Sequence, residues 1–121
     1  MPDFMNLRVW QAAHALTLAI YRVTSDYPKH ELYGLTSQSR RAAASISANL
    51  AEGSGRDSDA DYARFVRLAA GSANELEYHL LLAKDLGFVD SETWSALTSS
   101  LKSVRRRLVR LSQTLRNAAA S

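Results

Sequence analysis

The sequence contains no cysteine, which excludes disulfide bonds, thiolate metal sites and cysteine nucleophiles. It also has only 2 prolines and 5 glycines in 121 residues, fewer than a sheet protein with many tight turns requires. No alternating strand pattern of useful length occurs, and no apolar run is long enough to cross a bilayer. The first residues, MPDFMNLRVWQ, lack the basic and apolar regions of a signal peptide. We therefore expect an all-α, cytoplasmic protein that has no membrane partner.

Acidic residues are missing from one end of the chain. Residues 1–101 carry 9 Lys and Arg against 12 Asp and Glu, whereas residues 102–121 carry six basic residues and no acid. The six are Lys102, Arg105, Arg106, Arg107, Arg110 and Arg116. The body is therefore slightly acidic and the end strongly basic, although the net charge of the chain is only +3. This asymmetry indicates an acidic partner, either a nucleic acid or an acidic protein.

Apolar residues recur at steps of three and four along four segments, which is the spacing of an amphipathic helix. The predicted helices cover about residues 6–24, 36–53, 59–86 and 91–117. Four long helices joined by short loops form an antiparallel up-down four-helix bundle. We expect one such domain to span residues 1–121. Because the last two helices are longer, we expect their ends to project and to leave apolar surface for other copies of the chain.

Residues that favour helix ends mark several of these boundaries. Side chains of Ser, Thr and Asp cap a helix by accepting a hydrogen bond from a free backbone N–H group of the first turn. The expected N-caps are Thr36 or Ser37, Ser58 and Asp90. Glycine adopts the left-handed conformation that ends many helices, so we expect Gly53 and Gly87 to follow the second and third helices.

The second predicted helix has little bulk for a helix that must bury one face. In RRAAASISANLAEGSGR, residues 40–56, only Ile46 and Leu50 are large and apolar. Small side chains let neighbouring helix backbones approach closely. We therefore expect this helix to pack tightly against bulkier neighbours.

Polar residues on the second helix form one stripe. Its members are Gln38, Arg41, Ser45, Asn49 and Glu52, and the third helix carries a shorter stripe of Ser72, Glu75 and His79. In an antiparallel hairpin, Arg41 comes within about one helical turn of Glu75, so the two side chains can pair. Two interpretations stay open: a solvated face, or a buried or interfacial polar network that fixes the register of the helices. The pattern does not indicate catalysis.

The fourth predicted helix combines a heptad pattern with the basic end of the chain. One face holds the apolar residues Trp94, Leu97, Leu101, Val104, Leu108, Leu111 and Leu115. Lys102, Arg106 and Arg110 then form a row on another face. That row is either a solvated face whose Arg stems cover the apolar seam, or a surface that binds phosphates. The basic residues that can extend it are Arg105, Arg107, Arg116, Arg40 and Arg56.

Motifs for catalysis, metal binding and nucleotide binding are missing. The three histidines, His14, His30 and His79, do not have the spacing of metal ligands. The GSG segment at residues 53–55 lacks the Lys of a phosphate-binding loop. No serine is placed beside a base and an acid in a recognisable motif. We therefore expect no catalytic residue, no metal, no cofactor and no enzymatic activity.

Three segments resemble a known family. FMNLRVWQAA, YPKHELYGLTSQSRRAAASISANLAEGSGR and RFVRLAAGSANELE are similar to the small proteins encoded in intervening sequences of bacterial 23S ribosomal RNA genes. Accessory proteins of diversity-generating retroelements are similar to that family. The resemblance covers about residues 4–89, and beyond them the fourth helix matches only in its amphipathic, basic character. The family residues present are Gln38, Arg41, Ser45, Asn49, Glu52, Gly53, Arg56, Phe65, Gly71, Ser72 and Glu75.

The resemblance implies an all-α bundle that assembles as a ring-shaped homopentamer and has a role associated with nucleic acid. Two functions are consistent with these features. The first is a non-enzymatic homo-oligomer that binds RNA or DNA through the basic end of the fourth helix, by charge and with little sequence selectivity. The second is an adaptor that docks an acidic protein or, as the retroelement proteins imply, a reverse transcriptase. No residue pattern supports a third function, a small hydrolase.

Overall fold

Helical spacing of the apolar residues produces four long helices. The computed structural model describes residues 3–120, and no strand occurs among them. The long helices are α1 (Arg8–Thr24), α2 (Ser37–Ser54), α3 (Asp59–Asp85) and α4 (Ser91–Ala120). Three short turns are η1 (Phe4–Asn6), η2 (Lys29–Glu31) and η3 (Leu32–Thr36). Each predicted helix boundary lies within three residues of the observed one, and the predicted all-α fold is confirmed.

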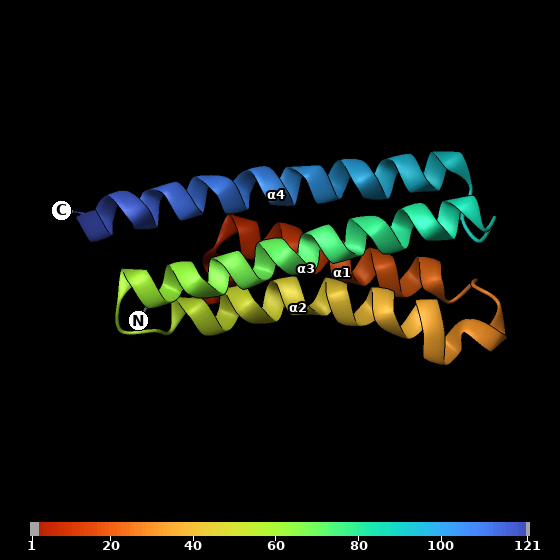
Figure 1. Cartoon of the computed structure of the whole chain (residues 1–121), viewed down its shortest axis with the longest axis horizontal. Helices are drawn as coiled ribbons and strands as arrows, with labels where there is room; N and C mark the ends of the chain where they lie inside the picture. The colour runs from red at the N-terminus through yellow and green to blue at the C-terminus, as the bar shows by residue number, and fades with distance from the viewer. Residues whose placement is uncertain (1–2, 121) are drawn as a thin grey trace.

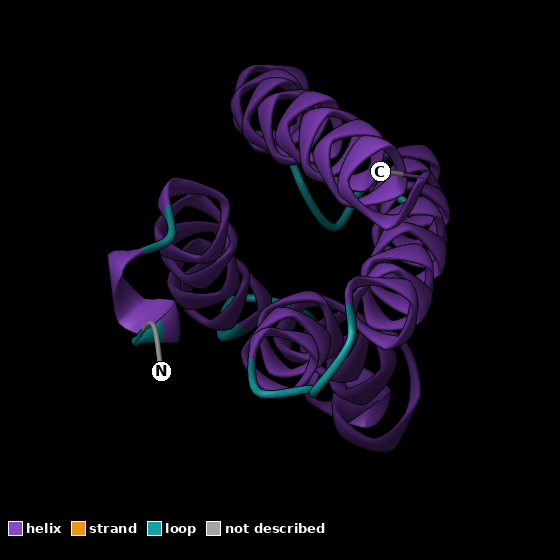
Figure 2. Cartoon of the chain, turned by 90° about the vertical axis from the view of Figure 1, so that its left-hand side faces the viewer, coloured by secondary structure: helices purple, strands orange, loops and turns teal. Residues whose placement is uncertain are grey.

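The helices run alternately up and down, so that each is antiparallel to the next (Figure 1). α2 lies between α1 and α3, while α4 packs against α3 and, less extensively, against α1. Viewed along the bundle, the four helices form an arc with α1 and α4 at its ends (Figure 2). The predicted antiparallel four-helix bundle is therefore confirmed, and α2–α3 is its most extensive helix contact.

Large apolar side chains from all four helices fill the core. Those that are completely or almost completely buried are Ile20, Ile46, Leu50, Leu76, Leu80, Leu101 and Leu108. On α2, Ala42 and Ala43 are fully buried as well. The small side chains of α2 therefore lie inside the bundle between bulkier neighbours, as the sequence predicts.

Gly53 has a different role from the predicted one. It lies inside α2, which continues to Ser54, and its backbone is not in the left-handed region. The prediction that Gly53 follows the helix is therefore wrong. A Cβ atom at this position would lie 2.7 Å from Phe65 Cβ and 3.0 Å from Tyr62 Cδ1. The glycine is needed because α2 approaches α3 too closely there for any side chain.

Three of the predicted helix ends are confirmed. Ser58 Oγ accepts a hydrogen bond from the Asp61 N–H group at 3.1 Å, and Asp90 Oδ1 accepts one from the Thr93 N–H group at 2.7 Å. Gly87 follows α3 with a φ of 79°, in the left-handed region that glycine favours. Ser58 thus starts α3, while Gly87 stops it and Asp90 starts α4 within a short loop, which sets α3 and α4 side by side.

The start of α2 differs from the prediction. Thr36 has helical backbone angles and its side chain makes no capping hydrogen bond, so the expected N-cap at Thr36 or Ser37 is wrong. The π-helical turn η3 instead runs directly into α2. Glu31 Oε1 accepts a hydrogen bond from the Leu35 N–H group at 2.9 Å and so caps η3. The capping side chain therefore precedes the whole η3–α2 segment.

The unequal helix lengths do not leave the apolar seam of α4 bare. Leu115, near the end of α4, is still buried, and Leu111 is half-buried, so the expectation that the helix ends leave apolar surface is wrong. Exposed large apolar side chains lie instead on outer faces, among them Leu18, Tyr21, Leu68, Tyr78, Leu81 and Val109. Within residues 3–120, none of the helices combines the length and hydrophobicity that crossing a membrane requires.

Candidate nucleic-acid interface

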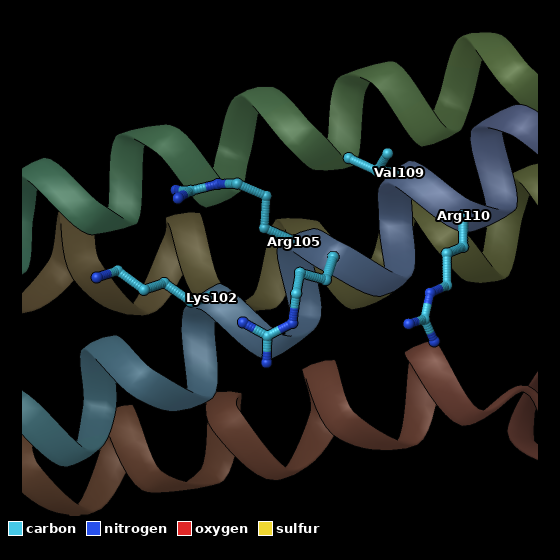
Figure 3. Close-up of a pocket in the computed structure, with 5 residues that line it drawn as sticks. Lys102, Arg105, Val109 and Arg110 are labelled. Atoms are coloured by element: carbon cyan, nitrogen blue, oxygen red, sulfur yellow. The ribbon is translucent and has the colours of Figure 1, made fainter.

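The exposed side of α4 carries a row of positive charge. Because the apolar seam faces the core, Lys102, Arg106 and Arg110 are exposed, with successive members about 6 Å apart along the helix axis. With Arg105 and Val109 they line an open hollow of about 510 Å³ (Figure 3). None of the three forms an ion pair with any residue in 3–120. Their charges are therefore available to an anionic ligand.

Arg105 lies on the flank of that row and already has a partner. It extends toward α3, whereas Arg110 extends to the opposite side of α4 (Figure 3). Arg105 Nη2 donates a hydrogen bond to Glu77 Oε1 at 3.1 Å, and 29% of the Arg105 side chain is exposed. The charge of Arg105 is thus offset by Glu77. The structure places this residue in the α3–α4 contact, so it attracts phosphates less than the row does.

α3 adds a basic residue that the charge pattern of the sequence does not single out. Arg67 is exposed, and within the described residues it forms no ion pair. It lines a smaller hollow of about 120 Å³ together with Arg105 and Val109. The antiparallel α3–α4 hairpin predicts its place, since the loop of residues 86–90, centred on residue 88, sets residue 67 opposite about residue 109. The basic face consists of Lys102, Arg106, Arg110 and Arg67.

The other basic residues of α4 lie beside or beyond the row. Arg107 is half-buried on another flank of the helix, and Arg116 is exposed near its end. Neither forms an ion pair with a residue that the structure describes. They add positive charge around the basic face without lining its hollow.

Arg56 does not join the basic face. It lies where α2 turns into α3, and its Nη2 donates to Glu52 Oε1 at 2.7 Å. Its Nε is 3.7 Å from Asp61 Oδ2, and its guanidinium carbon lies 4.6 Å from the centroid of the Phe65 ring. Arg40 is also separate, because it lies near the other end of α2 and binds α1. Local partners thus hold both residues away from the row on α4.

The polar stripes of α2 and α3 meet in a network. Arg41 Nη2 pairs with Glu75 Oε2, and Arg41 Nε donates to Gln38 Oε1 at 3.1 Å. Glu75 Oε2 also lies 3.1 Å from His79 Nε2. The pairing of Arg41 with Glu75 is the one that the hairpin register predicts. The two side chains are 50% and 37% exposed, so in a single chain this pair is partly solvated rather than buried.

Smaller polar groups continue the network toward the α2–α3 loop. Asn49 Nδ2 donates to the Ser45 carbonyl oxygen at 2.8 Å and to Ser45 Oγ at 3.1 Å. Ser72 Oγ donates to Ser45 Oγ at 3.0 Å and so joins α3 to α2. The Asn49 bonds lie within α2, whereas the Ser72–Ser45 bond links the two helices. Among residues 3–120, no three side chains that could bind a metal ion come together.

Glu75 titrates differently from an ordinary glutamate. Partial burial raises the pKa of its carboxyl group, but the hydrogen bonds and charges of His79 and Arg41 outweigh this effect and hold the pKa below its ordinary value. A carboxyl group whose pKa is lowered in the folded state stabilises the fold at neutral pH. An ordinary glutamate has a pKa of about 4.3. The stabilising contribution of Glu75 begins to decrease as the pH falls below that value, and it is lost once the pH is below the lowered pKa.

Truncation of Arg41 tests the strength of this pair. We expect Arg41→Ala to raise the pKa of Glu75 and to lower the free energy of unfolding by less than about 1 kcal/mol at neutral pH, because the pair is partly solvated. In acid, where Glu75 is protonated in both proteins, this difference disappears. NMR titration of the Glu75 carboxyl carbon and thermal melts at both pH values measure the two effects. A loss of about 3 kcal/mol or more would show that another copy of the chain shields the pair.

A sequence model of the 23S rRNA-intervening sequence protein family matches residues 5–110. The chain belongs to this family. The match extends beyond residue 89, where the resemblance seen in the sequence ends, and continues along α4 through Arg110. The row of Lys102, Arg106 and Arg110 therefore lies inside the part of the chain that matches the 23S rRNA-intervening sequence proteins, whereas Arg116 lies outside it.

One solved structure with the same fold comes from the S23 ribosomal protein family. It is the crystal structure of a protein of unknown function from Bacteroides thetaiotaomicron VPI-5482. The two chains share 21% sequence identity and superpose with a TM-score of 0.81, over 87% of this chain and 95% of that one. At this identity the likeness shows the shared fold alone. No curated protein matches the chain.

Proposed function

We propose that this 23S rRNA-intervening sequence protein is a non-enzymatic homo-oligomer that binds RNA or DNA through its phosphates. The observation that carries the proposal is the basic face, where exposed cations without an ion pair among the described residues border an open hollow. Members of the row on α4 are about 6 Å apart, close to the spacing of phosphates along a strand. The row can therefore follow a nucleic-acid backbone. Such contacts carry little sequence information.

A titration with RNA at several salt concentrations tests this proposal. The probe is a fluorescently labelled, single-stranded RNA with a 5′-hydroxyl end, and fluorescence anisotropy reports binding. The logarithm of the binding constant is expected to fall linearly with the logarithm of the salt concentration, by about 0.7 for each phosphate contacted. Two unrelated sequences of equal length are expected to bind alike. The proposal fails if wild-type protein does not bind either RNA at low salt.

The homo-oligomeric state is a separate part of the proposal. Its support is the apolar surface on the outer faces of α1 and α3, including Leu18, Tyr78 and Leu81. A ring would repeat the basic face by symmetry, so that weak phosphate contacts add through multivalency. We expect light scattering to give more than twice the 13.4 kDa mass of one chain, with a homopentamer as the expected species. A monomer at high micromolar concentration would contradict this expectation.

Val109 favours a second candidate function, the docking of an acidic protein. Its side chain is 51% exposed and lines the hollow among Arg105, Arg106 and Arg110. An apolar side chain surrounded by cations suits a peptide that carries both acidic and apolar residues. This adaptor does not require RNA binding at low salt, so the same titration separates the two functions.

A further inference from the structure

A second basic hollow lies far from the basic face. It is formed by the segment between α1 and α2 and by the first turn of α2, at the end of the bundle away from the C-terminus (Figure 1). Its volume is about 380 Å³, and none of the residues that line it is acidic. Two of them, Lys29 and Arg40, are basic. The hollow therefore has a positive character of its own.

Arg40 is held in place by neutral groups. Its Nε donates to Thr24 Oγ1 at 2.9 Å, and its Nη2 donates to the Tyr21 carbonyl oxygen and to Ser25 Oγ, both at 3.3 Å. The guanidinium carbon lies 4.8 Å from the centroid of the Tyr21 ring. The side chain is half-buried, and no carboxylate that the structure describes pairs with it. The Arg40 guanidinium group is thus held in one orientation before any ligand binds. Its Nη1 donates to none of the described residues and is available to a ligand.

Lys29 provides a second free cation at the same hollow. It is exposed and forms no ion pair with a residue in the described range. The carboxylate of Glu31, close to it in sequence, is already engaged. Its Oε1 accepts the Leu35 N–H group, and its Oε2 lies 3.9 Å from His30 Nε2. Two cations without a carboxylate partner therefore border one hollow, which suits a doubly charged oxyanion.

Aromatic side chains lie beside the hollow that Lys29 and Arg40 line. A neighbouring hollow of about 440 Å³ shares Leu32 and Arg40 with the first and is also lined by Tyr21 and Tyr33. Tyr33 is 92% exposed, and Tyr21 is 45% exposed. Exposed aromatic rings beside an arginine are a platform on which a nucleobase can stack. An anion in the first hollow and a planar ring in the second would both lie next to Arg40.

We propose that these two hollows bind a nucleoside monophosphate, either free or as the 5′ end of a single strand. Arg40 Nη1 and the Lys29 ammonium group bind the phosphate oxygens, and Tyr33 stacks on the base. A phosphate monoester carries up to two negative charges, whereas a phosphate within a strand carries one, so the site favours a strand end over the interior. This site is independent of the basic face and of the function proposed for it.

NMR spectroscopy with AMP tests the site. AMP is expected to shift the backbone amide signals of residues 21–40 at lower concentration and by a larger amount than those of residues 102–110. Lys29→Gln and Arg40→Gln are each expected to weaken AMP binding by about tenfold, because each removes charge-assisted hydrogen bonds. The Lys29 side chain forms no hydrogen bond or ion pair with a described residue, so its variant keeps the test valid if Arg40→Gln destabilises the protein. Arg22→Gln is the matched control, since Arg22 is an exposed cation of α1 that does not line either hollow.

Further probes distinguish binding of the base from binding of the phosphate, and a free nucleotide from the 5′ end of a strand. Tyr33→Ser is expected to weaken AMP binding by about fivefold or more and to leave inorganic phosphate binding unchanged. Binding of AMP identifies a free nucleotide, and binding of a 5′-phosphorylated RNA without AMP binding identifies a strand end. The proposal is wrong if neither ligand shifts residues 21–40 at millimolar concentration. It is also wrong if a 5′-hydroxyl RNA shifts them equally, or if Lys29→Gln binds as tightly as wild type.

Discussion

Replacing Arg106 and Arg110 together by glutamine is expected to weaken binding of a single-stranded RNA roughly fiftyfold at about 50 mM salt. Both side chains are exposed on one row of α4 and have no ion pair among residues 3–120, so each can neutralise one phosphate. Loss of two phosphate contacts lowers the slope of the salt dependence by about 1.4. Anisotropy titrations with the 5′-hydroxyl RNA at several salt concentrations measure both quantities.

A matched variant separates local contacts from net charge. Arg22→Gln combined with Lys29→Gln also removes two positive charges, but at the other end of the bundle. Neither residue lies near the basic face. This control is expected to keep most of the affinity and nearly the same salt slope. Helicity and oligomer mass are expected to be unchanged in both variants. Equal losses of affinity would show that overall charge, rather than the basic face, determines binding.

Replacing Gly53 by alanine is expected to lower the free energy of unfolding by about 2 kcal/mol, although alanine is the better helix former. The added Cβ atom would lie 2.7 Å from Phe65 Cβ, which is fixed to the α3 backbone and cannot rotate away. α2 must therefore move away from α3, which weakens the most extensive helix contact of the bundle. Chemical denaturation monitored by circular dichroism measures the change.

Gly71→Ala is the control, because it makes the same substitution on α3 without a steric conflict. A Cβ atom at Gly71 has no heavy atom within 4 Å, and this residue is exposed. Alanine is expected to stabilise the protein there by up to about 1 kcal/mol, through its higher helix propensity. The two substitutions therefore have opposite signs. Stabilisation by both would contradict the close approach of α2 to α3 at Gly53.

Features that depend on neighbours along one helix could be predicted from the sequence. The steps of three and four that place Leu101 and Leu108 in the core also leave Arg106 and Arg110 exposed. The Arg41–Glu75 pair could be predicted as well, because a short loop fixes the register of α2 and α3. The same reasoning across the α3–α4 loop would have identified Arg67 as part of the basic face.

Features that depend on close packing between helices could not be predicted. A glycine near a helix end is equally consistent with a left-handed C-terminal residue and with a tight helix contact, and only the position of Phe65 distinguishes them at Gly53. Arg105 carries the same charge as Arg106, yet its angle around α4 directs it to Glu77. The partners of Arg40 could not be predicted either, because they lie on α1. The segment that joins α1 to α2 contains a π-helical turn, which has no simple sequence signal.

The arc of helices also determines the order in which the protein can fold and open. Loops of four and five residues close the α2–α3 and α3–α4 hairpins, so the entropy lost on forming them is small and they can form early. α1 is joined to α2 by a longer segment, and its contact with α4 is less extensive than the α1–α2, α2–α3 and α3–α4 contacts. Detachment of α1 is therefore the easiest partial unfolding, and its amide hydrogens exchange with solvent before those of α3. Every such opening also releases Arg40 from its acceptors on α1.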